Sequence, residues 1–169
     1  MYKVETYEVT DLEDSESGLL IAENEEWILV KHIPVDYVID GYRLYKKEFV
    51  TKRERTKKEK QIEKVLELKG IEINQPYNFQ FSDTLNLLKW SENEFGFFEF
   101  QDDSETELFY GKIREVKNNL LTIDMIKSDG AIERDYDYEY DIDEIRVITF
   151  QTDYFVSIGL LMNDKLYKE

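Results

Sequence analysis

The feature that most constrains the fold is a pattern of strands and turns that occurs twice along the chain. When Gly18 is placed on Gly111, further positions correspond: Trp27-Ile-Leu-Val30 with Leu120-Leu-Thr-Ile123, Ile33 with Ile126, Asp36 with Asp129 and, after three additional residues in the second copy, Glu48-Phe49 with Glu144-Ile145. Residue identity is low, but agreement in spacing is typical of a diverged structural duplication. We therefore expect Gly18 and Gly111 at equivalent kinks and Trp27 and Leu120 at equivalent core positions.

This pattern predicts a mainly β protein with helices, of the α+β class. We expect two tandem small, strongly bent antiparallel barrels, residues 1–52 and 95–169, joined by a helical connector over residues 53–94. Strong helix formers fill residues 53–69 before Gly70, and Asp83 can cap a second, short helix over residues 83–90. Apolar residues at helical spacing after Asp153 indicate a helix at the end of the second unit.

The connector and the turns permit finer predictions. In helix 53–69 we expect an apolar stripe of Ile62, Val65 and Leu66 to be buried. We expect the lysines of its first half to be exposed: Lys57, Lys58 and Lys60. Asp40-Gly41 and Ser128-Asp-Gly130 are typical of tight hairpins. They predict paired strands over residues 37–39 and 42–44, and over 120–126 and 131–140.

The repeated unit resembles the Sm-like and SH3-like small barrels. The likeness rests on Gly111-Lys-Ile113, Asn118-Asn119 and Leu120-Leu-Thr-Ile-Asp-Met-Ile126, and it covers residues 1–52 and 95–150. It implies a small barrel and, for the Sm-like family, RNA binding through an Asp/Asn pair and a basic residue near the last strand. Here that region reads Tyr140-Asp-Ile-Asp-Glu-Ile145, which is acidic, and this departure argues against RNA binding.

Charge and composition exclude several classes of function. The chain has 22 Lys and Arg against 38 Asp and Glu, a net charge of −16, so its field repels phosphate backbones and attracts basic surfaces. A short basic stretch over residues 53–70 separates two acidic regions. There is no cysteine, and we find neither an 18-residue apolar run nor a signal sequence, so we expect a cytoplasmic protein without membrane contact.

Known catalytic and cofactor motifs are missing from the sequence. His32 is the single histidine, so neither a cysteine–histidine pair nor a histidine-based metal cluster can form. We find no phosphate-binding glycine loop and no metalloprotease motif. We therefore predict no catalytic residues, no metal site and no cofactor, and we interpret His32 as structural rather than as a lone general base.

Two groups of residues are candidates for binding a partner. In the segment 135–144 tyrosine and carboxylate side chains alternate, which predicts a strand with an acidic outer face. The candidate residues are Asp135, Asp137, Glu139, Asp141 and Asp143, with Tyr37 and Tyr42 of the Asp40-Gly41 hairpin as aromatic anchors. A merely solvated acidic face and simple hairpin packing are the competing interpretations.

These observations favour a non-enzymatic acidic protein, an inhibitor or immunity-type protein that occludes a basic partner such as a nuclease or another nucleic-acid-binding protein. The first alternative is a scaffold of two small barrels, with a homodimer among its forms. An RNA-associated Sm-like protein that uses the basic helix comes next. A metal-dependent hydrolase on the acidic row is the last alternative.

Overall fold

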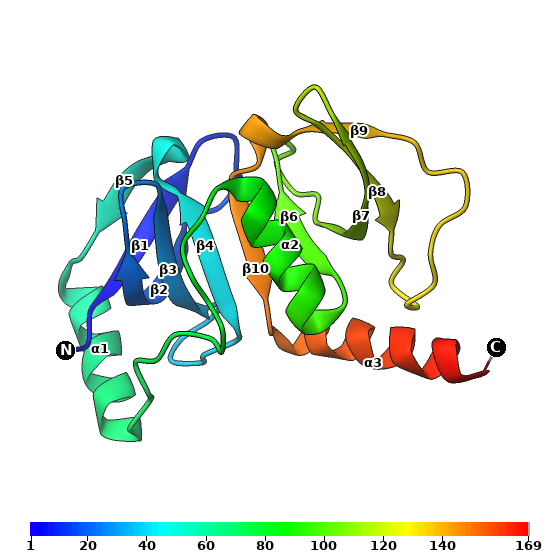
Figure 1. The fold of residues 1–169 in the computed structure, drawn as a ribbon. Coiled ribbons are helices and arrows are strands. Elements are labelled where there is room, and N and C mark those ends of the chain that lie inside the picture. Colours follow the sequence, from blue (N-terminus) through cyan, green and yellow to red (C-terminus); the bar gives the residue numbers. More distant parts are fainter. Residues whose placement is uncertain (169) are drawn as a thin grey trace. The chain divides into compact units, whose positions relative to one another are not determined.

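In the computed structural model, which describes residues 1–168, the chain divides into two compact units. Unit 1 comprises Met1–Phe81 with Asp103–Thr106, and unit 2 comprises Ser82–Asp102 with Glu107–Glu169. Each unit holds five strands, and every strand pairing within a unit is antiparallel (Figure 1). The prediction of a mixed α+β protein is confirmed.

The strands follow the same order in both units. Those of unit 1 are β1 (Val4–Val9), β2 (Glu16–Glu23), β3 (Trp27–Ile33), β4 (Tyr42–Lys46) and β5 (Val50–Glu54). Those of unit 2 are β6 (Phe98–Gln101), β7 (Phe109–Lys117), β8 (Leu120–Met125), β9 (Glu139–Asp141) and β10 (Val147–Phe150). Unit 1 has the order β5-β1-β2-β3-β4 and unit 2 the order β10-β6-β7-β8-β9. The described pairings do not join the two outer strands of either array, so closed barrels are not confirmed.

Strand register shows how closely the two units correspond. Gly18 pairs with His32 and Gly111 with Met125, so equivalent residues of the first three strands differ by 93 in number. The pairs Glu5–Gly18 and Phe98–Gly111 give the same shift. In the fourth and fifth strands the shift is 95, because Tyr45 lies opposite Ile28 and Tyr140 opposite Leu121. The second copy therefore has two additional residues before its fourth strand, rather than the predicted three.

Gly18 and Gly111 occupy equivalent places, as predicted. A Cβ atom added to Gly18 would lie 2.5 Å from Val30 Cγ2, and one added to Gly111 would lie 3.0 Å from Ile123 Cδ1. The register then shifts after Leu20 in β2 and after Ile113 in β7, so each glycine is followed by a bulge at the same spacing. Close strand approach and a bulge together bend the second strand of each unit.

Two core and turn predictions were wrong. Trp27 and Leu120 both begin the third strand of their unit, but Trp27 is fully buried whereas Leu120 is 36% exposed. Asp40-Gly41 does not form a two-residue turn, because residues 34–41 form one long connection between β3 and β4. Gly41, with φ of 70°, ends that connection.

The turn at Ser128-Asp-Gly130 forms as predicted, since the Gly130 amide donates a hydrogen bond to the Lys127 carbonyl, but the long strand expected after it does not. Beyond β8 a single bridge joins Ile126 to Ile132, and residues 133–138 belong to no strand. The sheet resumes at Glu139, where β9 pairs with β8 over three residues. A long connection therefore takes the place of the predicted strand over residues 131–140.

Three helices lie in the described residues: α1 (Lys57–Lys69), α2 (Thr84–Phe95) and α3 (Asp153–Lys168). The prediction that the first helix starts at Arg53 was wrong, because Arg53 pairs with Tyr7 as part of β5. Thr56 caps α1, since its hydroxyl accepts a hydrogen bond from the Lys58 amide and its own amide donates to Glu59. Gly70 ends α1 in the left-handed conformation.

The second helix is longer than the predicted 83–90. It begins after Asp83, which accepts a hydrogen bond from the Asn86 amide, and it ends before Gly96. The C-terminal helix begins after Thr152, whose hydroxyl accepts a hydrogen bond from the Phe155 amide. None of the described helices is long and apolar enough to cross a membrane.

Helix α1 packs on the sheet of unit 1 through the predicted stripe. Ile62 and Leu66 are buried in a cluster with Val4, Leu19 and Ile33, whereas Val65 is half-buried. The three lysines of the first half, Lys57, Lys58 and Lys60, are exposed as predicted. The stripe is thus narrower than expected, because buried carboxylates occupy its other positions: Glu59 and Glu63.

Helix α1 offers a matched pair of leucine substitutions. Leu66→Ala is expected to lower the free energy of unfolding of unit 1 by about 2 to 5 kcal/mol, because it removes a fully buried side chain and leaves a cavity. Leu68→Ala, in the same helix but 75% exposed, is expected to change it by no more than about 0.5 kcal/mol. Denaturant titration of both variants checks the packing, and equal effects would contradict it.

Candidate binding surfaces

The predicted acidic row lies on the connection between β8 and β9 and on the residues that follow it. All five candidate carboxylates are exposed: Asp135, Asp137, Glu139, Asp141 and Asp143. The prediction of one strand through all five carboxylates was wrong for the first half of the row, because Asp135 has a φ of 59° and lies outside any strand. The row is instead a curved acidic segment, defined here as residues 133–143.

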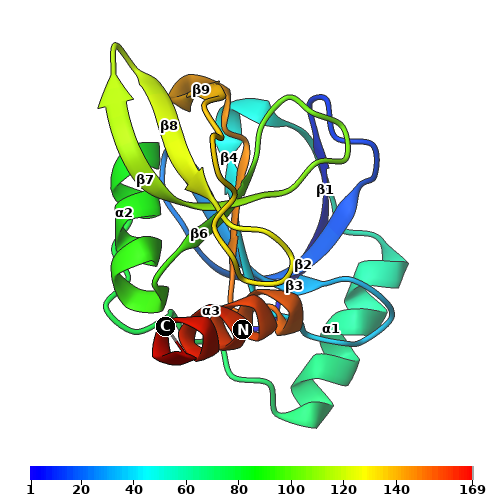
Figure 2. The ribbon, with the colours of Figure 1, turned by 90° about the vertical axis from the view of Figure 1, so that its right-hand side faces the viewer.

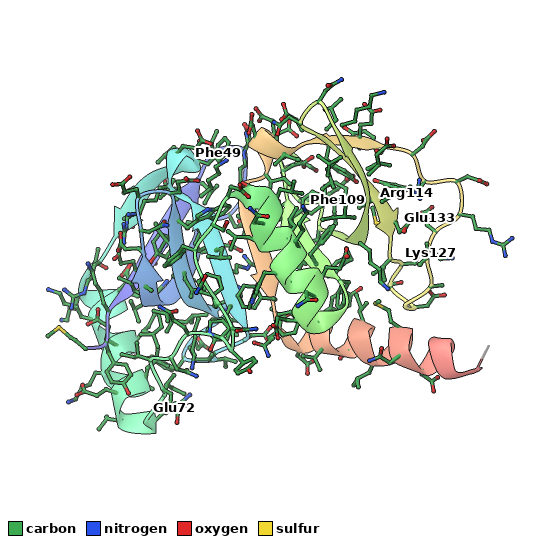
Figure 3. The ribbon with its side chains drawn as sticks, in the orientation of Figure 1. Phe49, Glu72, Phe109, Arg114, Lys127 and Glu133 are labelled. Atoms are coloured by element: carbon green, nitrogen blue, oxygen red, sulfur yellow. The ribbon has the colours of Figure 1, made fainter. Side chains whose placement is uncertain are left out.

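Neighbouring groups hold the acidic segment in place. Arg114 donates a hydrogen bond to the Tyr136 carbonyl over 2.7 Å and pairs with the Asp124 carboxylate over 2.8 Å. Figure 3 shows Arg114 and Glu133 on this side of unit 2. Asp141 accepts a hydrogen bond from the Asp143 amide, which begins the short 3-10 turn Ile142–Glu144. Among the described residues no ion pair neutralises Asp135, Asp137, Glu139 or Asp143.

The tyrosines of this segment do not share one buried face, contrary to the prediction. Tyr140 is buried against Phe100 and Phe109, and its hydroxyl is hydrogen-bonded to that of Tyr136. Tyr138 is 60% exposed although its ring contacts that of Tyr140. Burial raises the pKa of the Tyr140 hydroxyl well above its usual range, so the group stays neutral. Tyr138 is therefore the exposed aromatic beside the carboxylates.

The two tyrosines predicted as anchors belong to unit 1 and are engaged there. Tyr42 is buried, and its hydroxyl donates a hydrogen bond to the Asn74 carbonyl. Tyr37 is half-buried, and its hydroxyl accepts a hydrogen bond from Gln61 Nε2 over 2.7 Å. Tyr42 is thus a packing residue rather than an exposed anchor, while Tyr37 joins a loop to α1.

The two arginines of the basic stretch are paired with carboxylates of unit 1. Arg53 forms paired hydrogen bonds to the carboxylates of Glu5 and Glu23, and Arg55 does so with Glu63. These contacts hold the pKa of Glu23 at about 2, chiefly through the Arg53 hydrogen bond. Most of the arginine charge that could have bound a nucleic acid is therefore paired with internal carboxylates.

Unit 1 contains a groove that the sequence did not predict. Its volume is about 670 Å³, and three regions form most of it: residues 14–17 up to the start of β2, residues 32–37 from the end of β3, and α1. The lining includes Asp14, Glu16 and Ser17 on the first side, His32, Asp36 and Tyr37 on the second, and Lys58, Gln61 and Ile62 on the helix.

His32 is a buried member of that lining. The imidazole is 6% exposed, and its Nδ1 atom has no hydrogen-bond partner. Burial, with a smaller contribution from the Arg43 guanidinium, lowers the His32 pKa to about 4, so the ring is neutral at physiological pH. A pKa so far below neutrality is unsuited to general base catalysis at pH 7.

Glu16, whose carboxylate acts on the His32 imidazole, is already engaged. Glu16 forms an ion pair with Arg43 and accepts a hydrogen bond from the Tyr45 hydroxyl over 3.1 Å. The groove therefore has no carboxylate placed to orient His32 for proton transfer. Nor do the described residues contain a cluster of three histidine or carboxylate side chains that could hold a metal ion.

The groove could have been found only by aligning the two copies beyond their strands. In that alignment Tyr37 of the first copy corresponds to Gly130 of the second. This difference in side-chain size does not appear in the pattern of apolar residues. Comparison with known proteins adds no assignment: no protein-family model, no curated protein and no solved structure matches the chain.

The buried histidine predicts an acid sensitivity of unit 1. Because the folded pKa of about 4 lies below the ordinary 6.5, protonation favours the unfolded chain, and stability falls as the pH drops from 6.5 towards 4. The loss is expected to reach about 3 kcal/mol, and His32→Gln is expected to remove it. Denaturant titrations of both forms between pH 7 and 4.5 isolate this effect, because carboxylates with a lowered pKa, such as Glu23, contribute equally to both forms.

The measurement needs a signal from unit 1 alone. Trp27 is fully buried in unit 1 and Trp90 lies in unit 2, so a Trp90→Phe background makes the fluorescence report unit 1. An identical pH dependence with and without His32 would contradict the assignment.

Proposed function

We propose that this chain is a non-catalytic protein that binds and occludes a basic protein, and that the acidic segment 133–143 of unit 2 attracts that partner. The partner class comprises nucleases and other nucleic-acid-binding proteins, whose surfaces are basic. The observation that carries the proposal is the set of exposed carboxylates on one short segment, without ion pairs among the described residues.

The contrast between the two units supports this choice of surface. In unit 1 several cations have internal partners, as in the pairs Lys47–Glu23 and Lys52–Glu54. The acidic segment contains one cation, Arg134, which forms no ion pair with a described carboxylate, and the neighbouring Arg114 pairs with Asp124. Unneutralised charges of one sign raise the association rate with an oppositely charged protein, because they act before contact.

Tyr138 replaces Tyr42 as the aromatic anchor in this proposal. It is exposed and lies beside Asp137 and Glu139, whereas Tyr42 is buried. Aromatic side chains at the centre of an interface commonly set the dissociation rate, while charges at the rim set the association rate. The segment combines both kinds of residue within a few positions.

A scaffold of two small barrels is the second candidate function. Identical strand order and matching register support the inference that both units derive from one small, strongly bent barrel-like unit. In that case the acidic segment would serve solubility, and exposed apolar residues on α3, such as Val156 and Leu160, would carry the contacts.

Charge reversal distinguishes the two candidates. The variant Asp137→Lys with Glu139→Lys is expected to slow association with the partner recovered from the native host by at least fivefold at low salt. The difference should fade in about 1 M salt, where the Debye length is about 3 Å. Association kinetics at low and high salt measure it.

The matched control reverses two exposed carboxylates elsewhere. Glu25→Lys with Glu26→Lys changes the net charge equally but lies at the turn between β2 and β3 of unit 1. An equal slowing in both variants would show that net charge alone attracts the partner. No slowing in the first variant would support the scaffold.

A further inference from the structure

We propose that the groove of unit 1 is a second binding site, which takes an arginine or lysine side chain from an extended polypeptide segment. The inference rests on the proposed function for the class of partner, a basic protein, but not on the acidic segment. The evidence is a comparison of the two units: unit 1 has the groove, and side chains fill the equivalent position of unit 2.

The helix that forms one wall of the groove has a counterpart in unit 2. Thr56 caps α1 two residues after β5, and Thr152 caps α3 two residues after β10. Ile62 and Leu66 of α1 are buried, as are Ile158 and Met162 at the same distances from the second threonine. The repeat thus includes the helix, and each unit brings it to the connection between its third and fourth strands.

That connection meets the helix differently in the two units. In unit 2 a Cβ atom added to Gly130 would lie 2.8 Å from the Met162 amide nitrogen, so the loop lies on the helix backbone, as Figures 1 and 2 show. Tyr37 is the equivalent residue of unit 1. Its hydroxyl meets Gln61, and its carbonyl accepts a hydrogen bond from Lys69 Nζ over 2.9 Å. In unit 1 a tyrosine side chain therefore lies between the loop and the helix, whereas in unit 2 the glycine lets the loop contact the helix directly.

Side chains fill the corresponding space in unit 2. Ser17 and Lys58 line the groove, and their equivalents Tyr110 and Tyr154 contact each other with ring centroids 5.7 Å apart. His32 likewise has Met125 as its equivalent, through the pairing with Gly18 and Gly111. One copy therefore packs this position with large side chains, while the other lines a cavity with small and polar ones.

The charges of the groove indicate the ligand. Asp14 and Asp36 are exposed on its two loops, and no ion pair joins either to another described residue. Lys58 is the one cation of the lining. The third carboxylate of the lining, Glu16, is neutralised by Arg43, which lies outside the groove. Two carboxylates against one ammonium group leave the groove negative, which favours a cationic ligand. The volume of about 670 Å³ lies within the range of pockets that hold drug-sized ligands.

His32 adds a second, independent indication. Its Nδ1 has no partner, and an unpaired buried acceptor is costly unless a ligand satisfies it. The backbone of Ser17 also hydrogen-bonds the imidazole. We assign that bond to Nε2, which leaves Nδ1 as a free acceptor for a guanidinium or ammonium N–H. The atom is screened from water, so the ligand must displace the side chains that cover it.

Nuclear magnetic resonance of the full ¹⁵N-labelled chain tests the site. The probe is the peptide acetyl-Ala-Arg-Ala-amide, and its neutral match carries citrulline in place of arginine. We expect saturable amide shifts confined to residues 14–17 and 32–37, with at least tenfold weaker binding of the citrulline peptide. The ¹⁵N resonance of Nδ1 should be that of an unprotonated nitrogen in the free protein and should shift on binding.

Variants separate charge from space. Asp14→Asn with Asp36→Asn is expected to weaken binding at least tenfold, whereas Asp129→Asn, equivalent to Asp36 in unit 2, should leave it unchanged. Lys58→Tyr introduces the unit 2 residue and is also expected to abolish binding, although removal of a positive charge alone would strengthen it. The amide spectrum of each variant shows whether the fold is retained.

Several results would overturn the proposal: no saturable shifts, equal binding of both peptides, shifts outside the groove, or an Nδ1 that carries the proton. The variant Asp137→Lys with Glu139→Lys should bind the peptide normally. Failure of the acidic segment and failure of the groove are therefore distinguishable.

Discussion

The close approach of the second strand to the third sets the shape of each unit. At Gly18 the backbone of β2 leaves no room for a Cβ atom beside Val30, and Gly111 stands in the same relation to Ile123. In each unit the second strand pairs with the first and the third, and the bulge that follows the glycine bends it between these two partners. The glycine, the bulge and the strand order recur together in both units, although few residues are identical between them.

Carboxylates have opposite roles in the two units. Glu59 and Glu63 are buried in α1, where Thr56, Thr6, Arg55 and the Val4 amide satisfy them. Burial raises the pKa of each, and these hydrogen bonds more than offset it, so both remain ionised with a lowered pKa. The acidic segment lacks such partners and keeps its charge in solvent. The same residue types thus hold a helix in one unit and remain available to a partner in the other.

The sequence predicted what local spacing determines. The shift of 93 residues held across three strands because glycine and alternating apolar residues mark each strand. It failed where pairing overrides propensity: Arg53 lies among helix formers, yet it joins β1. The alternation around Asp137 also suggested a strand, but β8 provides partners only from Glu139 onward. The groove was not predicted because it depends on contacts of one loop with a helix, which apolar periodicity does not mark.

The connection before the fourth strand differs in length between the copies, yet the register on either side is the same. Adding residues to a loop costs little, since closure entropy grows only logarithmically with length. This connection is therefore a position at which the fold tolerates insertion without a slip of its strands. It could accept grafted recognition loops, which would make the unit a starting scaffold for engineered binding proteins without cysteine.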